Sequence, residues 1–352
     1  MTTAPISSHD GASRSPTSVA IVGAGGVVGS ELLGLIGEER VEIDDLRLFG
    51  TASSAGELYQ VKGDEVEVKQ FAPELLDGID LVVLAMPGGT VREVMPAVAE
   101  RGGCIVDLTP AYRLDPQVSL LAPIMGVHGS YNAGSHLSLA GAAAVQIASV
   151  IRAVSEIAEV SGVVATTLQS VSDAGRDGLD ELWGQCIAIC NQRGFEEEVF
   201  SEQIAFNCIP LIGTLLPDGS TSEERLIAGE VQRLLDAPEL SLAVTAVRVP
   251  VFHGCGVSMT IDLAKEVSVE DIVMALEKSP AIALAPDGEL PMHLSVIGKD
   301  SIHVGRIRYL DGQRKKLSVW SVVDNVRSVA ARGALSLILD YVQKKRGHDL
   351  PQ

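Results

Sequence analysis

A glycine-spaced segment near the N-terminus constrains the fold more than any other feature of this sequence. The apolar run at residues 19–22 predicts a short buried strand. After it comes Gly23-Ala24-Gly25-Gly26-Val27-Val28-Gly29, and then Ser30-Glu31-Leu32-Leu33, which begins a helix. Glycines spaced in this way let the backbone turn tightly and approach a pyrophosphate, which the free N–H groups of the following helix can bind. The segment predicts a dinucleotide site at Gly23, Gly25, Gly26, Val27, Val28 and Gly29, and the alternative is an ordinary strand–helix turn.

The order of the predicted elements divides the chain into two parts. Up to about residue 140, apolar strands at 46–49, 80–85 and 104–108 alternate with helical segments such as 91–100. This alternation predicts an α/β fold with a parallel, doubly wound sheet in a Rossmann-like domain. Farther on, predicted helices at 148–160 and 179–190 are segregated from β-rich runs, which favours an α+β domain with a mainly antiparallel sheet. These runs cover 163–171, 242–251, 257–263, 301–309 and 317–323, and a final amphipathic helix is predicted at 325–342.

Composition and charge exclude several classes of protein. The chain has 352 residues, a length that is sufficient for two packed domains. Of these residues 46% are hydrophobic and 21% are charged, which is the composition of an ordinary globular protein. A formal net charge of -19 argues against nucleic acid and anionic membranes as partners. No apolar run is long enough to span a bilayer, and residues 1–16 read as a disordered tail without a signal peptide's apolar core. Five cysteines without a disulfide framework fit a reducing, cytoplasmic compartment.

The sequence leaves the form of the cofactor open. In dinucleotide-binding folds an acidic residue near the end of the second strand binds the ribose 2′-hydroxyl. Here that strand ends in Gly50-Thr51, and no acid stands there. The hydroxyls of Thr51, Ser53 and Ser54 could hold a 2′-phosphate, weakly because no cation accompanies them. NADP and NAD both remain candidates, with weakened binding, and no metal is expected.

Eight blocks of sequence occur in the order seen in one enzyme family, and the chain resembles the aspartate-semialdehyde dehydrogenases from about Val19 to Val342. The resemblance implies a dinucleotide-binding domain at 17–140 plus 325–352 and a dimerisation and substrate domain at 141–324. It also implies a homodimer and the NADPH-dependent reduction of aspartyl phosphate through a thioester on a cysteine. The blocks are the glycine loop, the Ser-Ala-Gly turn at 54–56, and residues 107–113, 169–175, 203–210, 248–251, 304–308 and 320–327.

Carried over position by position, the resemblance implies that the reactive groups are missing. Gln146 matches a glutamine that follows the family's nucleophilic cysteine, which puts Ala142 at the nucleophile position. Counting from the substrate arginine, Arg248, puts Cys255 at the position of the acid/base histidine. The resemblance implies that Gln169 is retained to position the acyl group and that Arg113 and Arg248 are retained for substrate or anion binding. It also implies a cofactor contact at Asn325, Ser53 in place of the cofactor-loop arginine and Leu226 in place of the phosphate-binding lysine.

Each candidate residue also has an ordinary structural interpretation. Arg248 lies in an apolar strand, where burial demands a partner, so a structural salt bridge is the alternative to ligand binding. For Arg113 the alternative is a surface arginine. Cys255 could be a relocated thiol with His253 as its base, although a small residue filling the histidine's place is the simpler hypothesis. Cys186 and Cys190 have a helical spacing that metal sites use, but we expect them, with Cys104 and Cys208, to pack in the core.

Three functions follow from these expectations. The first is a paralogue, similar to the cysteine-less Usg-type proteins, that is inactive in the family reaction and acts by binding a dinucleotide or a small acidic metabolite. The alternative is an NAD(P)-dependent oxidoreductase acting on another small oxo or aldehyde acid, because hydride transfer needs no covalent thioester. A third is a regulatory partner of an active dehydrogenase.

Overall fold

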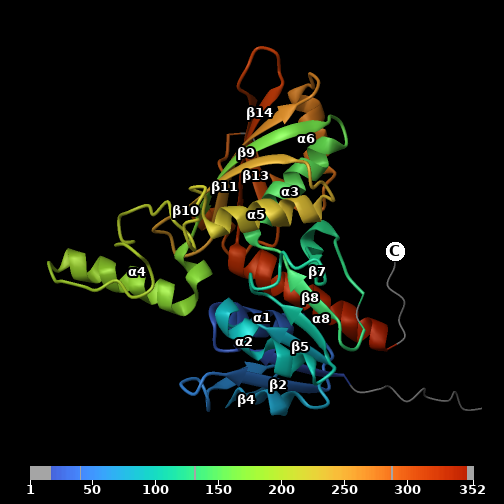
Figure 1. The fold of residues 1–352 in the computed structure, drawn as a ribbon, viewed down its shortest axis with the longest axis vertical. Helices are drawn as coiled ribbons and strands as arrows, with labels where there is room; N and C mark the ends of the chain where they lie inside the picture. The colour runs from blue at the N-terminus through green and yellow to red at the C-terminus, as the bar shows by residue number, and fades with distance from the viewer. Residues whose placement is uncertain (1–16, 40, 131, 287, 347–352) are drawn as a thin grey trace, which may run out of the picture.

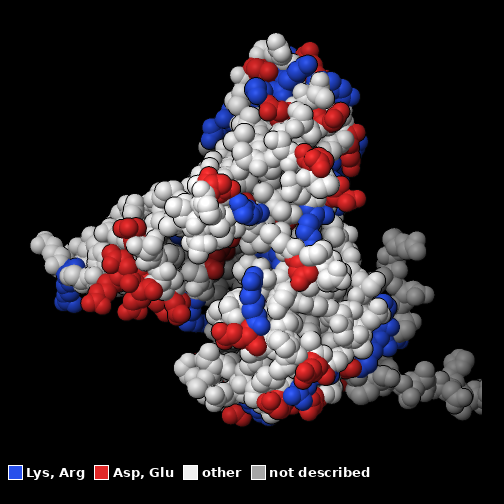
Figure 2. All heavy atoms as spheres, viewed as in Figure 1, with Lys and Arg blue, Asp and Glu red and all other residues white. Residues whose placement is uncertain are grey.

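The computed structural model describes residues 17–39, 41–130, 132–286 and 288–346, so the tail expected at 1–16 lies outside the described residues. Figure 1 shows a lower body built on one sheet, an upper body built on a second sheet, and a long arm that carries α4 (Gly175–Cys190) away from both. Figure 2 shows acidic side chains gathered along the lower edge of this arm. The last helix, α8 (Arg332–Lys345), returns to the lower body. No helix among the described residues has the length and apolar character that crossing a membrane requires.

The sheet of the lower body is parallel apart from one hairpin. Within the described residues it has eight strands, in the order β3-β4-β2-β1-β5-β6-β8-β7, and only β3 and β4 pair antiparallel. Its strands are β1 (Ser18–Val22), β2 (Asp45–Gly50), β3 (Leu58–Val61), β4 (Asp64–Gln70), β5 (Leu81–Leu84), β6 (Cys104–Asp107), β7 (Ser119–Leu121) and β8 (His136–Leu139). The doubly wound, Rossmann-like domain predicted from the sequence is confirmed.

Helices cover both faces of this sheet because alternate residues of each buried strand point to opposite sides. Val19 and Ile21 of β1 share a core with α1 (Val27–Glu38) and α8, whereas Ala20 and Val22 pack toward α2 (Gly88–Ala99). Two short helical turns connect strands of this sheet: Pro73–Leu76 lies between β4 and β5, and Pro123–Met125 lies between β7 and β8. The sequence therefore reads as continuous apolar runs at β1, β5 and β6, as expected for strands buried on both faces.

The upper sheet mixes the two pairing directions. Within the described residues it has six strands in the order β10-β9-β11-β14-β13-β12, and β9, β11, β14 and β13 pair antiparallel in succession. The outer pairs, β10 with β9 and β12 with β13, are parallel. The strands are β9 (Val160–Gln169), β10 (Ser241–Arg248), β11 (Cys255–Leu263), β12 (Ile282–Leu284), β13 (Ile302–Tyr309) and β14 (Lys316–Val323). The predicted second domain with a mainly antiparallel sheet is confirmed.

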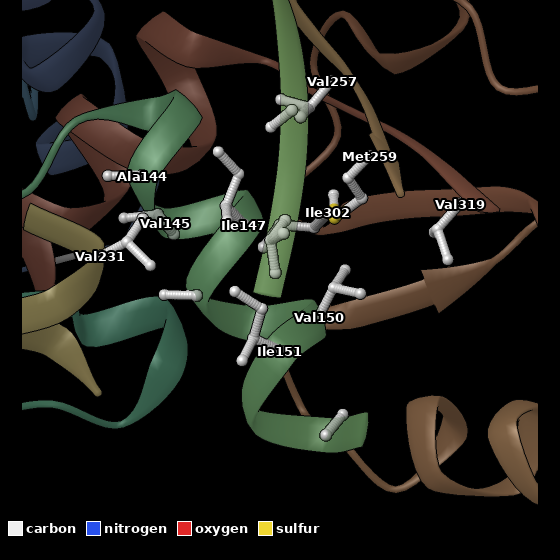
Figure 3. Packing of buried hydrophobic residues seen from close by; sticks show 14 of the residues in the cluster. Ala144, Val145, Ile147, Val150, Ile151, Val231, Val257, Met259, Ile302 and Val319 are labelled. Atoms are coloured by element: carbon white, nitrogen blue, oxygen red, sulfur yellow. The ribbon is translucent and has the colours of Figure 1, made fainter. Parts of the chain in front are cut away.

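One face of the upper sheet is covered by helices. In Figure 3, Ile147 of α3 (Ala142–Ser155) points toward β11, which carries Val257 and Met259, and Val145 lies beside Val231; all are buried. Helices α5 (Ser222–Leu234) and α6 (Val269–Glu277) contribute to the same core. On the opposite face the short α7 (His293–Val296) packs on β14, and Val164 of β9 has 57% of its surface exposed. Two further helical segments follow strands of the upper sheet: Val171–Ala174 leads from β9 into α4, and Asn325–Ala331 leads from β14 into α8 of the lower body.

Several local predictions need correction. The helix expected at 148–160 begins six residues earlier, at Ala142, and ends at Ser155, because Val160 already belongs to β9. The apolar stripe of α4 is covered on one side only: Leu182 is buried, whereas Trp183 is 59% and Ile187 is 44% exposed on the projecting arm. Consequently Cys190 is exposed and Cys186 only partly buried, and Cys208 is exposed as well, whereas Cys104 is buried as predicted.

Candidate functional site

The glycine loop has the backbone conformation that its sequence requires. Gly23 has φ +94°, and a Cβ built there would lie 2.3 Å from the carbonyl oxygen of Ala85. A Cβ on Gly29 would lie 2.2 Å from the carbonyl oxygen of Gly23. The loop thus packs backbone against backbone, and α1 begins at once with Val27 and Val28 after the N-cap Gly26. A loop with glycine at these contacts and a helix N-terminus directly behind it fits the pyrophosphate of a dinucleotide.

The polar loop after β2 lies beside the glycine loop. The hydroxyls of Thr51 and Ser53 are 2.8 Å apart, and a Cβ on Gly50 would come within 2.2 Å of the Ser54 hydroxyl. A Cβ on Gly25 would lie 3.4 Å from the Ser54 Cβ and 3.3 Å from a carboxylate oxygen of Glu57. Glu57 was not predicted from the sequence. An acidic residue is expected directly after β2, which ends at Gly50, whereas Glu57 lies seven residues farther along the loop.

The N-terminus of α3 forms the centre of a second polar cluster. Ala142 is the first residue of α3 and is partly exposed, and the N–H of Gly141 before it donates to the carboxylate of Glu230, 2.6 Å away. Glu230 is 1% exposed and pairs at 3.3 Å with Arg113, whose guanidinium also donates to the carbonyl of Leu108. Burial raises the pKa of Glu230, and Arg113 opposes that shift. Arg113 is therefore a partner of a buried carboxylate and not a free surface arginine.

Gln146 ties α3 to the upper sheet. Its amide nitrogen donates to the carbonyl of Cys255 at 3.1 Å, and its oxygen accepts from the Ser321 hydroxyl at 2.9 Å. Cys255 is 1% exposed and lies opposite Gln169 in the pairing of β11 with β9. Burial and the nearby carboxylate of Asp173 raise the pKa of the Cys255 thiol well above its ordinary value. A thiol in this setting stays protonated, which argues against the relocated nucleophile.

Gln169 contacts a partly buried carboxylate. Its amide nitrogen donates to Glu223 at 3.1 Å and to the Thr167 hydroxyl at 3.3 Å. Burial, reinforced by the charge of Glu230, raises the pKa of Glu223. Leu226, on the same helix α5, offers no charge to this carboxylate. The cluster thus carries a carboxyl group that stays protonated to a higher pH than an ordinary glutamate does.

Arg248 makes the structural salt bridge that was the alternative to ligand binding. Its side chain is buried, and one guanidinium nitrogen donates to the carbonyl of Ser170 at 2.6 Å and to Asp173 at 3.1 Å. Asn325 donates to the other Asp173 oxygen at 2.7 Å and accepts from the N–H of Gly254 at 2.8 Å. The Asn325 amide is thus used in holding the join between the two bodies, and its predicted cofactor contact stays a prediction.

The predicted site residues form two separate clusters. The structure brings Gln169, Glu223, Glu230, Cys255 and both predicted arginines around the start of α3, whereas the cofactor residues gather at the glycine loop. Arg176, two residues after Ala174, donates from α4 to the carbonyl of Gly25 at 3.2 Å. Among the described residues, no group of three or more His, Cys, Asp or Glu side chains is placed to hold a metal ion.

Comparison with known proteins identifies the family. The family model described as "Semialdehyde dehydrogenase, NAD binding domain" matches residues 18–128, and "Semialdehyde dehydrogenase, dimerisation domain" matches residues 152–328. The aspartate-semialdehyde dehydrogenase of Aquifex aeolicus is 31% identical over 326 residues, which is 91% of this chain and 96% of the relative. The chain belongs to the aspartate-semialdehyde dehydrogenase family. The corresponding protein of Bacillus subtilis is 29% identical over 330 residues, covering 91% of this chain and 95% of its own length.

Solved structures agree with this assignment to the aspartate-semialdehyde dehydrogenase family. Aspartate semialdehyde dehydrogenase II from Vibrio cholerae, in a complex with ASA, matches with a TM-score of 0.84 and 29% identity over 94% of this chain and 99% of that one. An enzyme of the same name from Candida albicans with NADP matches with a TM-score of 0.68 at 17% identity, over 94% of this chain and 99% of that one, which shows the shared fold. The resemblance to Usg-type proteins, the domain bounds and the role of each site residue stay predictions.

Proposed function

We propose that this protein binds a nicotinamide dinucleotide and a small acidic metabolite but does not carry out the acyl-transfer step of its family. The observation that carries the proposal is Ala142 at the start of α3, at the position that the sequence resemblance aligns with the nucleophile. The helix N-terminus and the Glu230–Arg113 pair surround this position, but alanine offers no lone pair to attack an acyl group. A thioester therefore cannot form there.

No neighbouring group replaces the missing nucleophile in this proposal. Cys255 is the thiol of the cluster, but it is buried and its pKa is raised, so little thiolate exists at neutral pH. Among the described residues, the side-chain hydrogen-bond partner of Cys255 is Gln146 and not His253, the base that a relocated nucleophile would need. The acidic groups, Glu223 and Glu230, are suited to holding protons and are weak nucleophiles when protonated.

The glycine loop supports the proposal that the protein binds a dinucleotide. An exposed face of the upper sheet supports the proposal that the protein self-associates. A bound dinucleotide would be held by the loop at Gly23 and the N-terminus of α1, and it would supply hydride chemistry. The sheet face bearing Val164 and Ser258 is exposed and belongs to the domain that matches a dimerisation family. We expect a homodimer in which this face is buried.

Reduction of a different oxo acid is the weaker candidate. It would use Arg248 to hold the substrate's carboxylate, but that guanidinium already bonds to Asp173 and to the carbonyl of Ser170. A screen of small oxo and aldehyde acids for consumption of reduced nicotinamide separates the two candidates. Turnover of any of them that depends on Arg248 would favour the reductase. A regulatory role would be favoured by stable association with an active dehydrogenase at micromolar concentrations.

The experiment compares cofactor binding with catalysis in the same preparation. We expect calorimetric titration to show saturable binding of NAD or NADP, while phosphate-dependent oxidation of aspartate semialdehyde stays at the background rate. Gly29→Ala, whose Cβ meets the carbonyl of Gly23, should abolish the titration signal. Gly34→Ala is the matched control, because it lies in the same helix with open space around its Cβ. Robust turnover by the wild-type protein would overturn the proposal.

A further inference from the structure

We propose that Glu57 makes the dinucleotide site selective for NAD over NADP. The inference rests on the proposed dinucleotide binding and adds the form of the cofactor. It depends on the place of one carboxylate between the glycine loop and the end of β2. In doubly wound sheets the adenosine ribose lies in that gap, and an acid there accepts a hydrogen bond from the 2′-hydroxyl.

Contacts on both sides place Glu57 in this gap. On the side of the glycine loop, a carboxylate oxygen of Glu57 lies 3.3 Å from where a Cβ of Gly25 would stand. On the side of β2, the backbone N–H of Glu57 donates to the carbonyl of Ser54 at 3.2 Å, and Ser54 packs against Gly50 at the strand end. The carbonyl of Glu57 accepts from the N–H of Val68 in β4 at 2.9 Å, which fixes the loop to the sheet.

The surroundings of Glu57 hold its charge toward the glycine loop. The hydroxyl of Tyr59 donates to the same Glu57 oxygen at 3.3 Å. Burial and the charge of Glu57 raise the pKa of Tyr59, so the phenol stays protonated and remains a donor. Within the described part of the chain, the second carboxylate oxygen has no hydrogen-bond partner and can accept from a ribose hydroxyl. A 2′-phosphate in the same gap would meet a carboxylate at hydrogen-bond distance, which is repulsive unless a cation intervenes.

Arg176 is a cation beside this arrangement. Its guanidinium donates to the carbonyl of Gly25 at 3.2 Å, and its charge also acts on Tyr59. The carbonyl of Gly25 belongs to the loop that faces the pyrophosphate, which NAD and NADP share. Arg176 therefore favours both dinucleotides, whereas Glu57 distinguishes them.

The test measures the dissociation constants of NADH and NADPH for the full-length protein by titration of the nicotinamide fluorescence. We expect NADH to bind ~10-fold more tightly or better, which corresponds to roughly 1.4 kcal/mol. Glu57→Gln removes the charge and should bring the two constants to within about threefold, mainly by strengthening NADPH binding. Glu65→Gln is the matched control, because Glu65 lies exposed on the same hairpin and bonds only to the side chain of Gln60 among the contacts described.

Each other outcome counts against the inference in a different way. Equal or tighter binding of NADPH by the wild type, or an unchanged ratio in Glu57→Gln, overturns the role of Glu57 while leaving dinucleotide binding in place. A selective loss of NADPH affinity in Arg176→Gln would assign the 2′ position to Arg176 and overturn it as well. Binding of neither dinucleotide would defeat the proposed function and this inference together.

Discussion

The carboxylate of Asp173 lies 3.1 Å from the guanidinium of Arg248, so a residue that could bind a ligand's carboxylate already holds one from its own chain. The pair is built into the join between the two bodies, because Asn325 donates to the second oxygen of Asp173. Asp173 keeps 31% of its side chain exposed while Arg248 keeps 9%. Asp173 therefore competes with a ligand carboxylate for the Arg248 guanidinium.

Replacing Asp173 by asparagine should test whether Arg248 can bind an added carboxylate. The variant leaves Arg248 without its carboxylate, and we expect a loss of about 1–3 kcal/mol in unfolding free energy, less than the ~3–5 kcal/mol of a fully buried pair. Millimolar malonate or succinate should then raise the melting temperature of Asp173→Asn more than that of the wild type. Asp262→Asn, which breaks the exposed pair with Lys316, is the control. Equal shifts in all three proteins would show that Arg248 does not accept an added carboxylate.

Removing the amide of Gln146 should uncouple α3 from the upper sheet. Gln146→Leu fills the same space but leaves the carbonyl of Cys255 and the hydroxyl of Ser321 without their partner. At about 1–3 kcal/mol for each unmade buried bond, we expect roughly 2–5 kcal/mol of destabilisation in chemical denaturation. Ser321→Ala should cost less, and the double variant should cost less than the sum of the two. Additive losses would contradict the direct bond.

The partly buried carboxyl of Glu223 should make stability fall with rising pH. Between its ordinary pKa of 4.5 and its raised value, the folded protein holds a proton that the unfolded chain has lost. Glu223 therefore lowers stability as pH rises through that window. Glu223→Gln should be more stable than the wild type at neutral pH and equal to it below the ordinary value. Glu197→Gln, at an exposed site, should show no such pH-dependent difference. A stability difference that does not change with pH would rule out the raised pKa.

A cysteine introduced at position 142 should be far more reactive than the native Cys255. The N-terminus of α3 favours a thiolate, because the N–H groups of the first turn carry partial positive charge. Peptide mapping after brief exposure to iodoacetamide should show rapid labelling of Ala142→Cys and none of Cys255 in the folded protein. The exposed Cys190 and Cys208 are internal references. Labelling of Cys255 as fast as Cys208 would show that its thiol is accessible and ionised.

Features encoded by a few adjacent residues could be predicted from the sequence. The glycine loop is one, because its spacing alone demands a backbone that only glycine can adopt at Gly23. The buried strands β1, β5 and β6 are others, since each is a short apolar run. The hairpin of β3 and β4 was missed because its residues are mostly polar and exposed and give no apolar pattern.

Relationships between distant residues could not be predicted. Asp173 and Arg248 are 75 positions apart, and only the parallel pairing of β10 with β9 brings the end of one strand beside the end of the other. The place of Glu57 could not be predicted, because the path of the loop between β2 and β3 decides where its carboxylate lies and the sequence pattern does not show that path. The apolar residues of α4 have the spacing of a buried helix face, which predicted core packing. The arm instead places Trp183 in solvent, because the spacing within a helix does not show what packs against it.

A single-turnover experiment tests the absence of thioester chemistry most directly. Stoichiometric protein is mixed with aspartate semialdehyde and a saturating oxidised dinucleotide, NAD and NADP in turn, and the absorbance of reduced nicotinamide is followed without phosphate. With Ala142 at the start of α3, we predict no burst above the rate of a protein-free control. A burst that approaches one reduced nicotinamide per chain would mean that a thiol does capture the aldehyde, and would contradict the account.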